Sequence, residues 1–353
     1  ILGYNQAFGW TGTNRNYNLD YEARAPFLAA SWALDTGLTL DGSIRFDTMR
    51  QTGLRTDASG GPFDVDGDGV IDAPESNVSL NTGIGGIADF EVDHTSYTLG
   101  ANYLISSNLS VFGRHAEGAA FNGERQLFNA LDTNGRLVSG GRETYIDETR
   151  QFEAGLKWQE SGDRIPGQLD FYATYFHAKT KEDNFEITTM RPVGNTYVSE
   201  GIETEFSYTY GVLDVTGSLT FTDAQIEASN TAPENIGNTP RRQANWIWSV
   251  TPSYALGSLG RLGLNFYGTT DAYVDDDNVY VLPGATITNV FADWYITDRA
   301  SLSIGVNNVF DTVLFTEAEN GRVFDTDLNG TPDVIIARSI NGRSATARFT
   351  YHF

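Results

Sequence analysis

Cysteine is absent from this chain of 353 residues, and histidine occurs only 4 times. Without cysteine, the protein can form no disulfide, holds no thiolate nucleophile and cannot build a Cys-ligated zinc or iron–sulfur site. The few histidines also leave little room for a His-rich metal site.

Cations are scarce as well. The 23 Lys and Arg residues stand against 46 Asp and Glu residues, which gives a net charge of −23. Nucleic-acid binding needs clustered cations facing phosphates, so we expect no nucleic-acid partner. The same balance argues against a protein held on anionic lipid by a basic patch.

Long hydrophobic runs are missing too. No stretch of roughly 18 apolar residues occurs, which excludes a transmembrane helix, and the mean hydropathy is −0.31. Strands of a membrane barrel are only half apolar, so that class stays open. The chain opens at Ile1 without a basic segment followed by an apolar one. We therefore expect no signal peptide, and either a processed chain or part of a longer one.

Apolar and polar residues alternate strictly in several segments. Between residues 38 and 47 the apolar side chains fall on even numbers and the polar ones on odd numbers. Residues 213–222 and 344–353 show the same alternation, with the apolar side chains on odd numbers. Successive side chains of a strand point to opposite faces, so these segments are strands with one apolar face. The fold class is therefore all-β.

Strand and loop lengths separate a membrane barrel from a soluble sandwich, which shows the same alternation. The segments reach about 9–11 residues, enough for a tilted strand to cross a bilayer. Short connections at residues 35–37, 106–108, 210–211 and 297–299 alternate with long polar ones. The long ones lie near residues 9–25, 49–90, 117–147, 180–196, 224–240, 271–282 and 312–341.

Alternating short turns and long loops are typical of outer-membrane barrels, whereas a sandwich has no reason to sort its loops by length. Seven long loops that each join an up-strand to a down-strand imply about 14 strands. We predict that residues 1–353 form one domain, a transmembrane antiparallel up-and-down β-barrel. Its long extracellular loops are expected near residues 49–90, 117–147 and 312–341.

The sharpest local motif is the acidic stretch DVDGDGVIDAPE at residues 64–75. It matches the 12-residue calcium-loop template throughout, with Gly69 at the sharp turn. The predicted ligands are Asp64, Asp66, Asp68, the Val70 carbonyl, Asp72 and a bidentate Glu75. We expect a structural calcium ion that stabilises the long loop at residues 49–90. The alternative is a solvated acidic loop tip.

A second acidic stretch, at residues 325–333, repeats part of this template. The candidate ligands of this weak second site are Asp325, Asp327, Asn329 and Asp333. Position 12 is Ile336, so the bidentate carboxylate is missing, and an Asx-rich turn explains the stretch equally well. The acidic run Asp275–Asp277 is expected to be solvated.

Signals for catalysis are lacking. Residues 83–88 fit G-x-G-x-x-A, but no helix is expected after them. A dinucleotide-binding site requires that helix, so this interpretation is rejected. No G-x-S-x-G occurs, and the histidines are scattered. We expect no enzymatic activity and no catalytic residue. Aromatic and arginine side chains in the loops are candidates to stack on or clamp a solute, with a structural role as the alternative for each. They are Trp10, Tyr17, Arg125 and Tyr273.

Several segments, in order along the chain, resemble the TonB-dependent outer-membrane receptors. The matching segments are residues 148–157 (ETRQFEAGLK), 171–179, 197–205 (YVSEGIETE), 238–241 (NTPR), 282–284 (LPG), 303–311 (SIGVNNVFD) and the last strand, 342–353. The resemblance implies a barrel of about 22 strands that encloses an N-terminal plug. A short box on that plug contacts the inner-membrane TonB complex.

The chain matches roughly the last 14 of those strands, and no plug or box is recognised in it. We expect the C-terminal part of such a receptor, or a 14-stranded barrel that closes on itself. The resemblance also implies that the C-terminal Phe353 is the assembly signal presented to the barrel-assembly machinery.

The function that the resemblance implies is energised uptake of a scarce, bulky solute across the outer membrane of a Gram-negative bacterium. A glycan is slightly favoured over a metal chelate or cobalamin, because the loop aromatics and the calcium loop resemble those of glycan-uptake receptors. The net charge of −23 also suits anionic ferric siderophores poorly. Expected partners are outer-membrane lipid, the TonB complex through a plug, the barrel-assembly machinery and the small solute itself. The alternatives are a passive 14-stranded porin-like channel, an outer-membrane hydrolase and a soluble calcium-binding lectin-like protein.

Overall fold

The computed structural model describes residues 4–5, 9–10, 15–76, 78–122, 131–139, 141–162, 164–186, 191–324 and 334–353. The chain divides into two compact units. The smaller one comprises residues 1–27, 45–96 and 119–147, and the larger one comprises residues 28–44, 97–118 and 148–353. No helix in the described ranges has the length and apolarity needed to cross a membrane.

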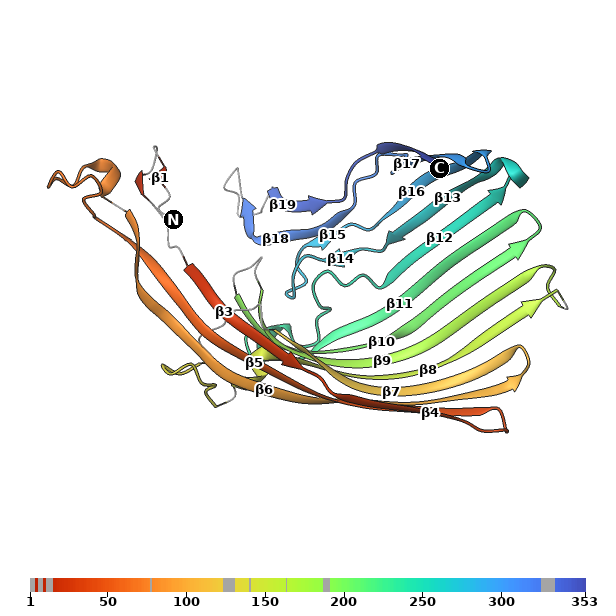
Figure 1. Ribbon diagram of the computed structural model, residues 1–353, viewed down its shortest axis with the longest axis horizontal. Coiled ribbons are helices and arrows are strands. Elements are labelled where there is room, and N and C mark those ends of the chain that lie inside the picture. Colours follow the sequence, from red (N-terminus) through yellow and green to blue (C-terminus); the bar gives the residue numbers. More distant parts are fainter. Residues whose placement is uncertain are drawn as a thin grey trace. The chain divides into compact units, whose positions relative to one another are not determined.

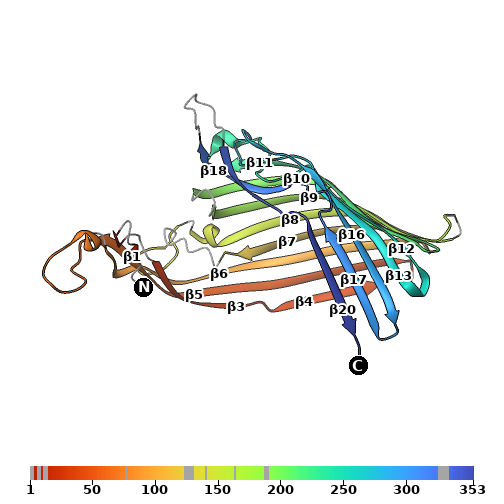
Figure 2. The same cartoon turned by 90° about the horizontal axis from the view of Figure 1, so that it is seen from above.

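Most described strands form one 14-stranded antiparallel sheet in the order β20-β17-β16-β13-β12-β11-β10-β9-β8-β7-β6-β5-β3, where β3 is Arg15–Arg24, and β4 also pairs with β5 (Figure 1). The strands are β4 (Phe27–Ala33), β5 (Leu38–Gly61), β6 (Val78–Ser106), β7 (Leu109–Phe121), β8 (Ile146–Ser161), β9 (Gln168–Glu186), β10 (Arg191–Tyr210), β11 (Leu213–Ser229), β12 (Trp246–Ala255), β13 (Gly260–Thr269), β16 (Ala285–Thr297), β17 (Ala300–Asn307) and β20 (Ser344–Tyr351). Chain neighbours thus lie side by side, as Figure 2 shows for β16, β17 and β20.

Short turns join these strands at one end, as the sequence predicts. The turns fall at residues 34–37, 107–108, 211–212 and 298–299, within one residue of the predicted ranges. Gly211 takes a left-handed φ of 61° in the tight β10–β11 turn, a conformation that other residues rarely adopt. Opposite these turns lie the short strands β14 (Ala272–Tyr273), β15 (Val281–Leu282), β18 (Phe315–Phe324) and β19 (Val334–Ser339), together with the 3-10 helix η4 (Pro233–Asn235). A further 3-10 helix, η5 (Gly257–Leu259), lies in the β12–β13 turn.

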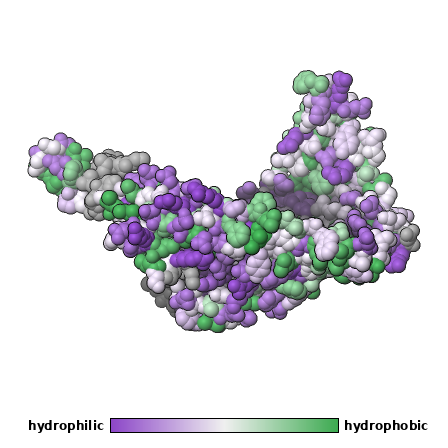
Figure 3. Space-filling model, turned by 60° about the horizontal axis from the view of Figure 1, so that its bottom comes forward, coloured by the Kyte–Doolittle hydropathy of each residue, from purple (hydrophilic) through white to green (hydrophobic). Residues whose placement is uncertain are grey.

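The apolar face of the sheet is exposed. Ile202 of β10 is 50% exposed, Leu219 of β11 is 41% exposed and Phe349 of β20 is 63% exposed. Green hydrophobic side chains accordingly reach the molecular surface among purple hydrophilic ones in Figure 3. In water, a soluble sandwich would bury such rows against a second sheet, so their exposure fits contact with hydrocarbon.

The opposite face is polar. Glu205 of β10 lies opposite Ser218 of β11, and Ser218 lies opposite Ser249 of β12. Further along, the Asn265 side-chain amide donates to Thr251 Oγ1 at 2.8 Å. Hydrogen-bonding side chains on this face and apolar ones on the other are the pattern of a barrel wall between a watery lumen and lipid.

The strands are longer than the sequence predicts. The expected loop at residues 49–90 contains the end of β5 and the start of β6, and the expected loop at residues 180–196 is strand up to Glu186 and again from Arg191. The expected loop at residues 9–25 contains β3 (Arg15–Arg24). The polar composition of these segments predicts loops, but strand pairing continues through them because the backbone supplies the ladder hydrogen bonds.

The two edges of the sheet carry different strands. Within the described part of the chain, β20 forms one edge, β3 and β4 lie at the other beside β5, and no pairing joins the two edges. Unpaired backbone N–H and C=O groups cannot be satisfied in hydrocarbon. Each edge therefore needs a partner strand in the membrane.

The smaller unit holds a compact apolar cluster. Met49 and Val92 are buried there, with Phe90 and Tyr145 in ring contact at 4.4 Å. Gly135 closes the adjoining loop, because its carbonyl accepts a hydrogen bond from the backbone N–H of Asp89 at 2.9 Å. The unit also contains β1 (Tyr4–Asn5), β2 (Gly9–Trp10), β3, and the 3-10 helices η1 (Ala73–Glu75) and η3 (Gly141–Tyr145).

The facing of β11 can be tested with two neighbouring substitutions. Leu219→Arg is expected to lower the free energy of unfolding in lipid vesicles by about 2–4 kcal/mol, because it places a charge near the hydrocarbon midplane. Ser218 points to the opposite face, so Ser218→Arg is the matched control and should cost far less. Equal losses in denaturant titrations would contradict this assignment.

Candidate functional site

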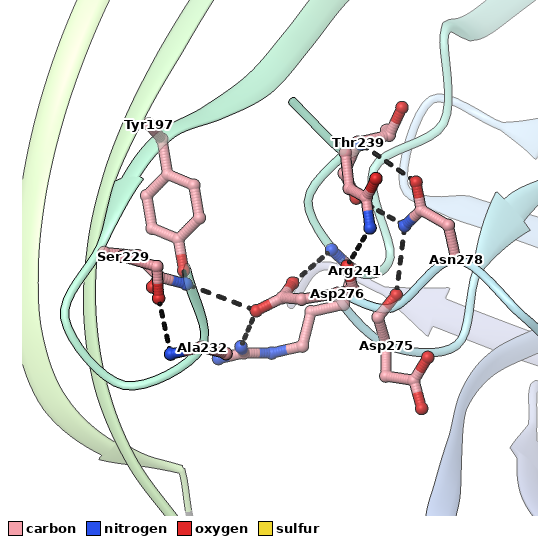
Figure 4. A network of polar contacts seen from close by, with 10 residues as sticks. Tyr197, Ser229, Ala232, Thr239, Arg241, Asp275, Asp276 and Asn278 are labelled. Atoms are coloured by element: carbon pink, nitrogen blue, oxygen red, sulfur yellow. Dashed lines mark hydrogen bonds and ion pairs between the residues drawn. The ribbon is translucent and has the colours of Figure 1, made fainter. Parts of the chain in front are cut away.

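Three loop segments of the larger unit dock onto one another at the end opposite the short turns. They are residues 226–245 with η4, the β14–β15 hairpin, and the β18–β19 hairpin. Figure 4 shows the polar network that joins the first two segments to the wall strand β10. We call these three segments the docked loops.

Asp276 is the centre of the network (Figure 4). Its carboxylate accepts hydrogen bonds from the Arg241 backbone N–H at 2.8 Å and from Arg241 Nη1 at 3.0 Å. The Asn195 side chain of β10 donates to the same carboxylate at 3.3 Å, and Asn238 donates to the Asp276 carbonyl at 2.9 Å. One residue of the β14–β15 hairpin thereby fixes both the neighbouring loop and the wall. The Asp276–Arg241 pair is charge-assisted and largely buried, so removing one partner is costly.

Asn278 makes a second link between the same segments. Its side-chain oxygen accepts from the Thr239 backbone N–H at 2.9 Å, and its side-chain nitrogen donates to the Thr239 carbonyl at 2.7 Å. That nitrogen also lies 3.2 Å from the Asp275 carbonyl. An amide that bonds both polar groups of one residue imitates strand pairing. Asn278 has a φ of 59°, a left-handed conformation that Asn tolerates better than most residues.

The β18–β19 hairpin joins the docked loops through apolar packing and ion pairs. Val274, Leu282 and Ala318 form a buried cluster. Arg242 Nη1 lies 3.2 Å from a carboxylate oxygen of Glu317, and Arg338 pairs with the other oxygen of that carboxylate. Apolar burial and partly buried ion pairs together make the docked loops one assembly.

Asp275 is buried within this assembly, which corrects the expectation that the run Asp275–Asp277 is solvated. The residue is 8% exposed, and neither carboxylate oxygen has a hydrogen-bond partner among the described residues. The pKa of Asp275 is raised to about 7, chiefly by burial and next by the neighbouring carboxyls of Asp277 and Asp276. The sequence shows three adjacent acids, but only tertiary packing decides which of them water reaches.

The predicted calcium loop lies in the smaller unit. Carboxylate oxygens of Asp64, Asp66 and Asp68 all lie within 4.8 Å of one another. Their arrangement is held by the backbone, since Asp64 accepts from the Gly67 N–H at 2.6 Å and from the Gly69 N–H at 2.8 Å. The three predicted ligands at positions 1, 3 and 5 are therefore brought together.

Glu75 closes this loop instead of joining that cluster. One carboxylate oxygen accepts from the backbone N–H of Val65 at 2.7 Å and of Asp66 at 3.3 Å, and the other lies 3.4 Å from the Asp72 N–H. The Phe63 N–H donates to the Glu75 carbonyl at 3.0 Å. Glu75 thus ties the start of the loop to its end, and Asp72 and Glu75 stand outside the group of converging carboxylates.

Electrostatics differ among the three acids. The pKa of Asp64 is lowered, chiefly by the hydrogen bond from the Gly69 N–H. The pKa of Asp66 is raised: the Asp68 N–H lowers it, but desolvation and the charges of Asp68, Glu75 and Asp64 outweigh that effect. Mutual repulsion of this kind is what a bound divalent cation would relieve.

The other predicted site residues belong to different units or lie outside what the structure describes. Tyr17 is exposed on β3 in the smaller unit, whereas Tyr273 is half-buried on β14 in the larger one. Only the backbone of Trp10 is described, and Arg125 and the second acidic stretch at residues 325–333 lie outside the described residues. Phe353 is fully exposed beyond β20, with its ring 5.2 Å from the Tyr351 ring.

Sequence reasoning missed the asparagines that organise this end of the wall. Asn289 of β16 donates to the Asn265 side chain at 3.1 Å and accepts from the Asn308 backbone N–H at 2.8 Å. Asn308, 2% exposed, accepts from the Thr312 N–H at 2.8 Å. Its position in the segment NNVFD was a usable signal, because Asn next to a turn often bonds its own backbone.

Comparisons with known proteins give a consistent result. The family described as TonB dependent receptor-like, beta-barrel, matches residues 2–309. The metal-pseudopaline receptor CntO of Pseudomonas aeruginosa is 26% identical over 202 residues, which cover 53% of this chain and 27% of that protein. The chain thus spans about a quarter of the length of the curated relatives it matches.

The solved structures with similar folds include two uptake receptors. The ferric yersiniabactin uptake receptor FyuA from Yersinia pestis has a TM-score of 0.71 and 16% identity, covering 97% of this chain and 47% of that chain. The ferric-catecholate import receptor Fiu from E. coli K12, in its closed form, has a TM-score of 0.70 and 16% identity. The match covers 96% of this chain and 45% of that chain. At such identity the similarity shows a shared fold.

Asp275 makes the docked loops sensitive to pH. Its folded-state pKa of about 7 lies above the value of about 3.9 for an exposed carboxyl. Its contribution to stability is therefore fully present at low pH and lost as the pH rises through about 7. We expect hydrogen-exchange protection of residues 272–282 to fall as the pH rises from about 4 to about 7 and to stay level above that.

The variant Asp275→Asn should hold that protection nearly constant across the same range, because an amide does not ionise. Asp298→Asn, in a short turn at the other end of the sheet, should keep the pH dependence of the unmodified protein. Identical pH profiles for Asp275→Asn and the unmodified protein would show that Asp275 is not the titrating group.

Proposed function

The chain belongs to the TonB-dependent receptor β-barrel family, and from this premise we propose that it forms the barrel of a receptor that imports a metal chelate. Such barrels lie in the outer membrane of Gram-negative bacteria, and this chain shares their fold. The observation that carries the proposal is the family match over residues 2–309.

The names of similar proteins support the substrate class. They are receptors for metal-pseudopaline, ferric yersiniabactin and ferric catecholates. A glycan, which the loop aromatics favoured, stays a prediction without support from these names. Metal chelates are compact and polar, and the hydrogen-bonding inner face of β10–β12 would suit their passage.

The chain's own residues would shape the binding mouth and would provide the surface that contacts a plug. The docked loops would form a preorganised wall of the binding mouth, because Asp276 and Asn278 fix their backbone before any ligand arrives. Preorganisation lowers the ordering cost of binding. Energy would come from the TonB complex acting on a plug, for which the polar inner face of the sheet would be the contact surface.

We also propose that residues 64–75 bind a structural calcium ion. Support comes from the convergence of Asp64, Asp66 and Asp68 within 4.8 Å and from the hard-oxygen chemistry that calcium prefers. These three carboxylates would hold the ion, while Glu75 keeps the loop closed. When bound, calcium would cancel the mutual repulsion of the acids and stiffen the long β5–β6 connection.

Phe353 is proposed as the assembly signal for the barrel-assembly machinery. Its support is the full exposure of Phe353 beyond the last residue of β20. A terminal aromatic in this position is accessible to a partner strand or groove, as recognition by β-augmentation requires.

Uptake by cells tests the receptor proposal. Cells that produce the protein should accumulate radiolabelled metal bound to pseudopaline, yersiniabactin or a catecholate, and only when TonB is present. Asp276→Ala should weaken chelate binding several-fold, because it leaves Arg241 without its partner. Asp298→Ala, at the short-turn end, is the control. Uptake of a linear glycan instead, or steady conductance without TonB, would contradict the proposal.

Limited proteolysis tests the calcium proposal. Calcium should slow cleavage within residues 62–76, because the ion ties the loop together. Asp68→Ala should raise the calcium concentration needed for half-maximal protection on the order of tenfold or more, since a ligand is lost. Asp35→Ala, in a short turn, should leave protection unchanged. Equal cleavage with calcium and with chelator in the unmodified protein would contradict calcium binding.

A further inference from the structure

Asp275 is a buried carboxyl that the polar network of the docked loops does not use. Its carboxylate points away from Asp276 and Asn278 (Figure 4), and neither of its oxygens has a hydrogen-bond partner among the described residues. Only 8% of the residue is exposed. A buried carboxylate without a partner is costly, so proteins usually neutralise such a group with a cationic side chain, a proton or a metal ion. The surroundings of Asp275 decide among these three.

The arginines of the docked loops are engaged elsewhere. Arg241 pairs with Asp276, and the other two arginines, Arg242 and Arg338, share one glutamate. In the described part of the chain, no ion pair includes Asp275, and the charged groups that shift its pKa are carboxyls alone. A cationic side chain therefore does not neutralise this carboxylate.

A second carboxyl faces Asp275 instead. Asp277, two residues further along the same turn, lies within hydrogen-bonding reach of the Asp275 carboxyl. Asp277 is exposed, and one of its oxygens accepts a hydrogen bond from the Val279 backbone N–H at 3.1 Å. A carboxylate has about four lone-pair sites, so this bond leaves most of them for a ligand. The two carboxylates form a converging pair, and water reaches it from the Asp277 side.

Two facing carboxylates can share either a proton or a cation. A shared proton neutralises one of the two charges, whereas a divalent cation neutralises both. Calcium and magnesium prefer carboxylate oxygens, and water completes their coordination where the protein supplies few ligands. We propose that Asp275 and Asp277 together bind one hard divalent cation, calcium or magnesium, at the tip of the β14–β15 hairpin.

This site uses no residue of the calcium loop at residues 64–75, which belongs to the smaller unit. It also requires no imported solute. Asp276 and Asn278 tie the same hairpin to residues 239 and 241, so a cation that closes the hairpin stabilises the docked loops with it. Two carboxylates and water give weak binding, with a Kd of about 10⁻⁴–10⁻³ M, as in extracellular calcium modules.

Hydrogen exchange of residues 272–282 tests the site at a pH of about 8, where Asp275 is largely ionised. At about ten times its Kd, a cation that binds only the closed hairpin lowers the opening constant about tenfold. Titration with calcium or magnesium should therefore slow exchange about tenfold relative to chelator, and the ion that acts at the lower concentration is the preferred one. Sodium at the same ionic strength should not slow exchange. If neither divalent ion slows exchange, a shared proton replaces the cation and the proposal is wrong. Equal slowing by sodium would also overturn it, because charge screening would then explain the effect.

Four variants separate cation binding from folding. Asp277→Asn changes an exposed residue, so the hairpin should stay folded while divalent cations no longer slow its exchange. Asp275→Asn should also lose the cation effect, yet remain protected in chelator because its amide carries no charge. Glu234→Gln removes an exposed negative charge from η4 in the same assembly, and Asp68→Ala removes a ligand from the calcium loop. Both of these controls should keep the cation effect. An unchanged cation response in Asp275→Asn and Asp277→Asn would overturn the site.

Discussion

Backbone hydrogen bonding in hydrocarbon is the constraint on which the rest of this structure depends. Every N–H and C=O group that faces lipid needs a partner from a neighbouring strand, because the bilayer supplies none. One continuous antiparallel sheet meets that demand from β20 to β3. With the backbone satisfied, side chains are free to differ by face. Apolar rows through Ile202 and Leu219 face outward, and polar rows through Glu205 and Ser218 face inward.

Outside the membrane-spanning part of the strands, water can satisfy backbone groups, and side-chain contacts determine the structure of the connecting segments. The strands continue as paired ladders, but neither face needs to be apolar there. The connecting segments are then ordered by side chains: Asp276 and Asn278 bond to backbone groups of residues 238–241, and Glu317 joins two arginines. Burial of Asp275 within this assembly leaves one carboxyl whose charge is costly, which makes the docked loops sensitive to pH.

Period-two alternation was enough to predict the barrel wall, the short turns and the facing of strands such as residues 213–222, because a strand's two faces meet different solvents. The alternation could not show where strands end, since β9 and β10 continue with polar residues on both faces. Nor could it show that Asp275 is buried while Asp277 is exposed, because that depends on how separate loops pack. The spacing of Asp64, Asp66 and Asp68 did predict their convergence, since local backbone turns alone produce it, whereas the part played by Glu75 depends on its contacts with Val65 and Asp66.

The central claim is that alternate residues of one strand meet lipid and water. Spin labels placed singly at residues 201–207 of β10, in the protein reconstituted in vesicles, test it most directly through collision with oxygen and with a water-soluble nickel complex. Labels at positions 202, 204 and 206 should collide mainly with oxygen, and labels at positions 203 and 205 mainly with the nickel complex. Equal accessibility to both reagents at every position, with no alternation, would contradict the account.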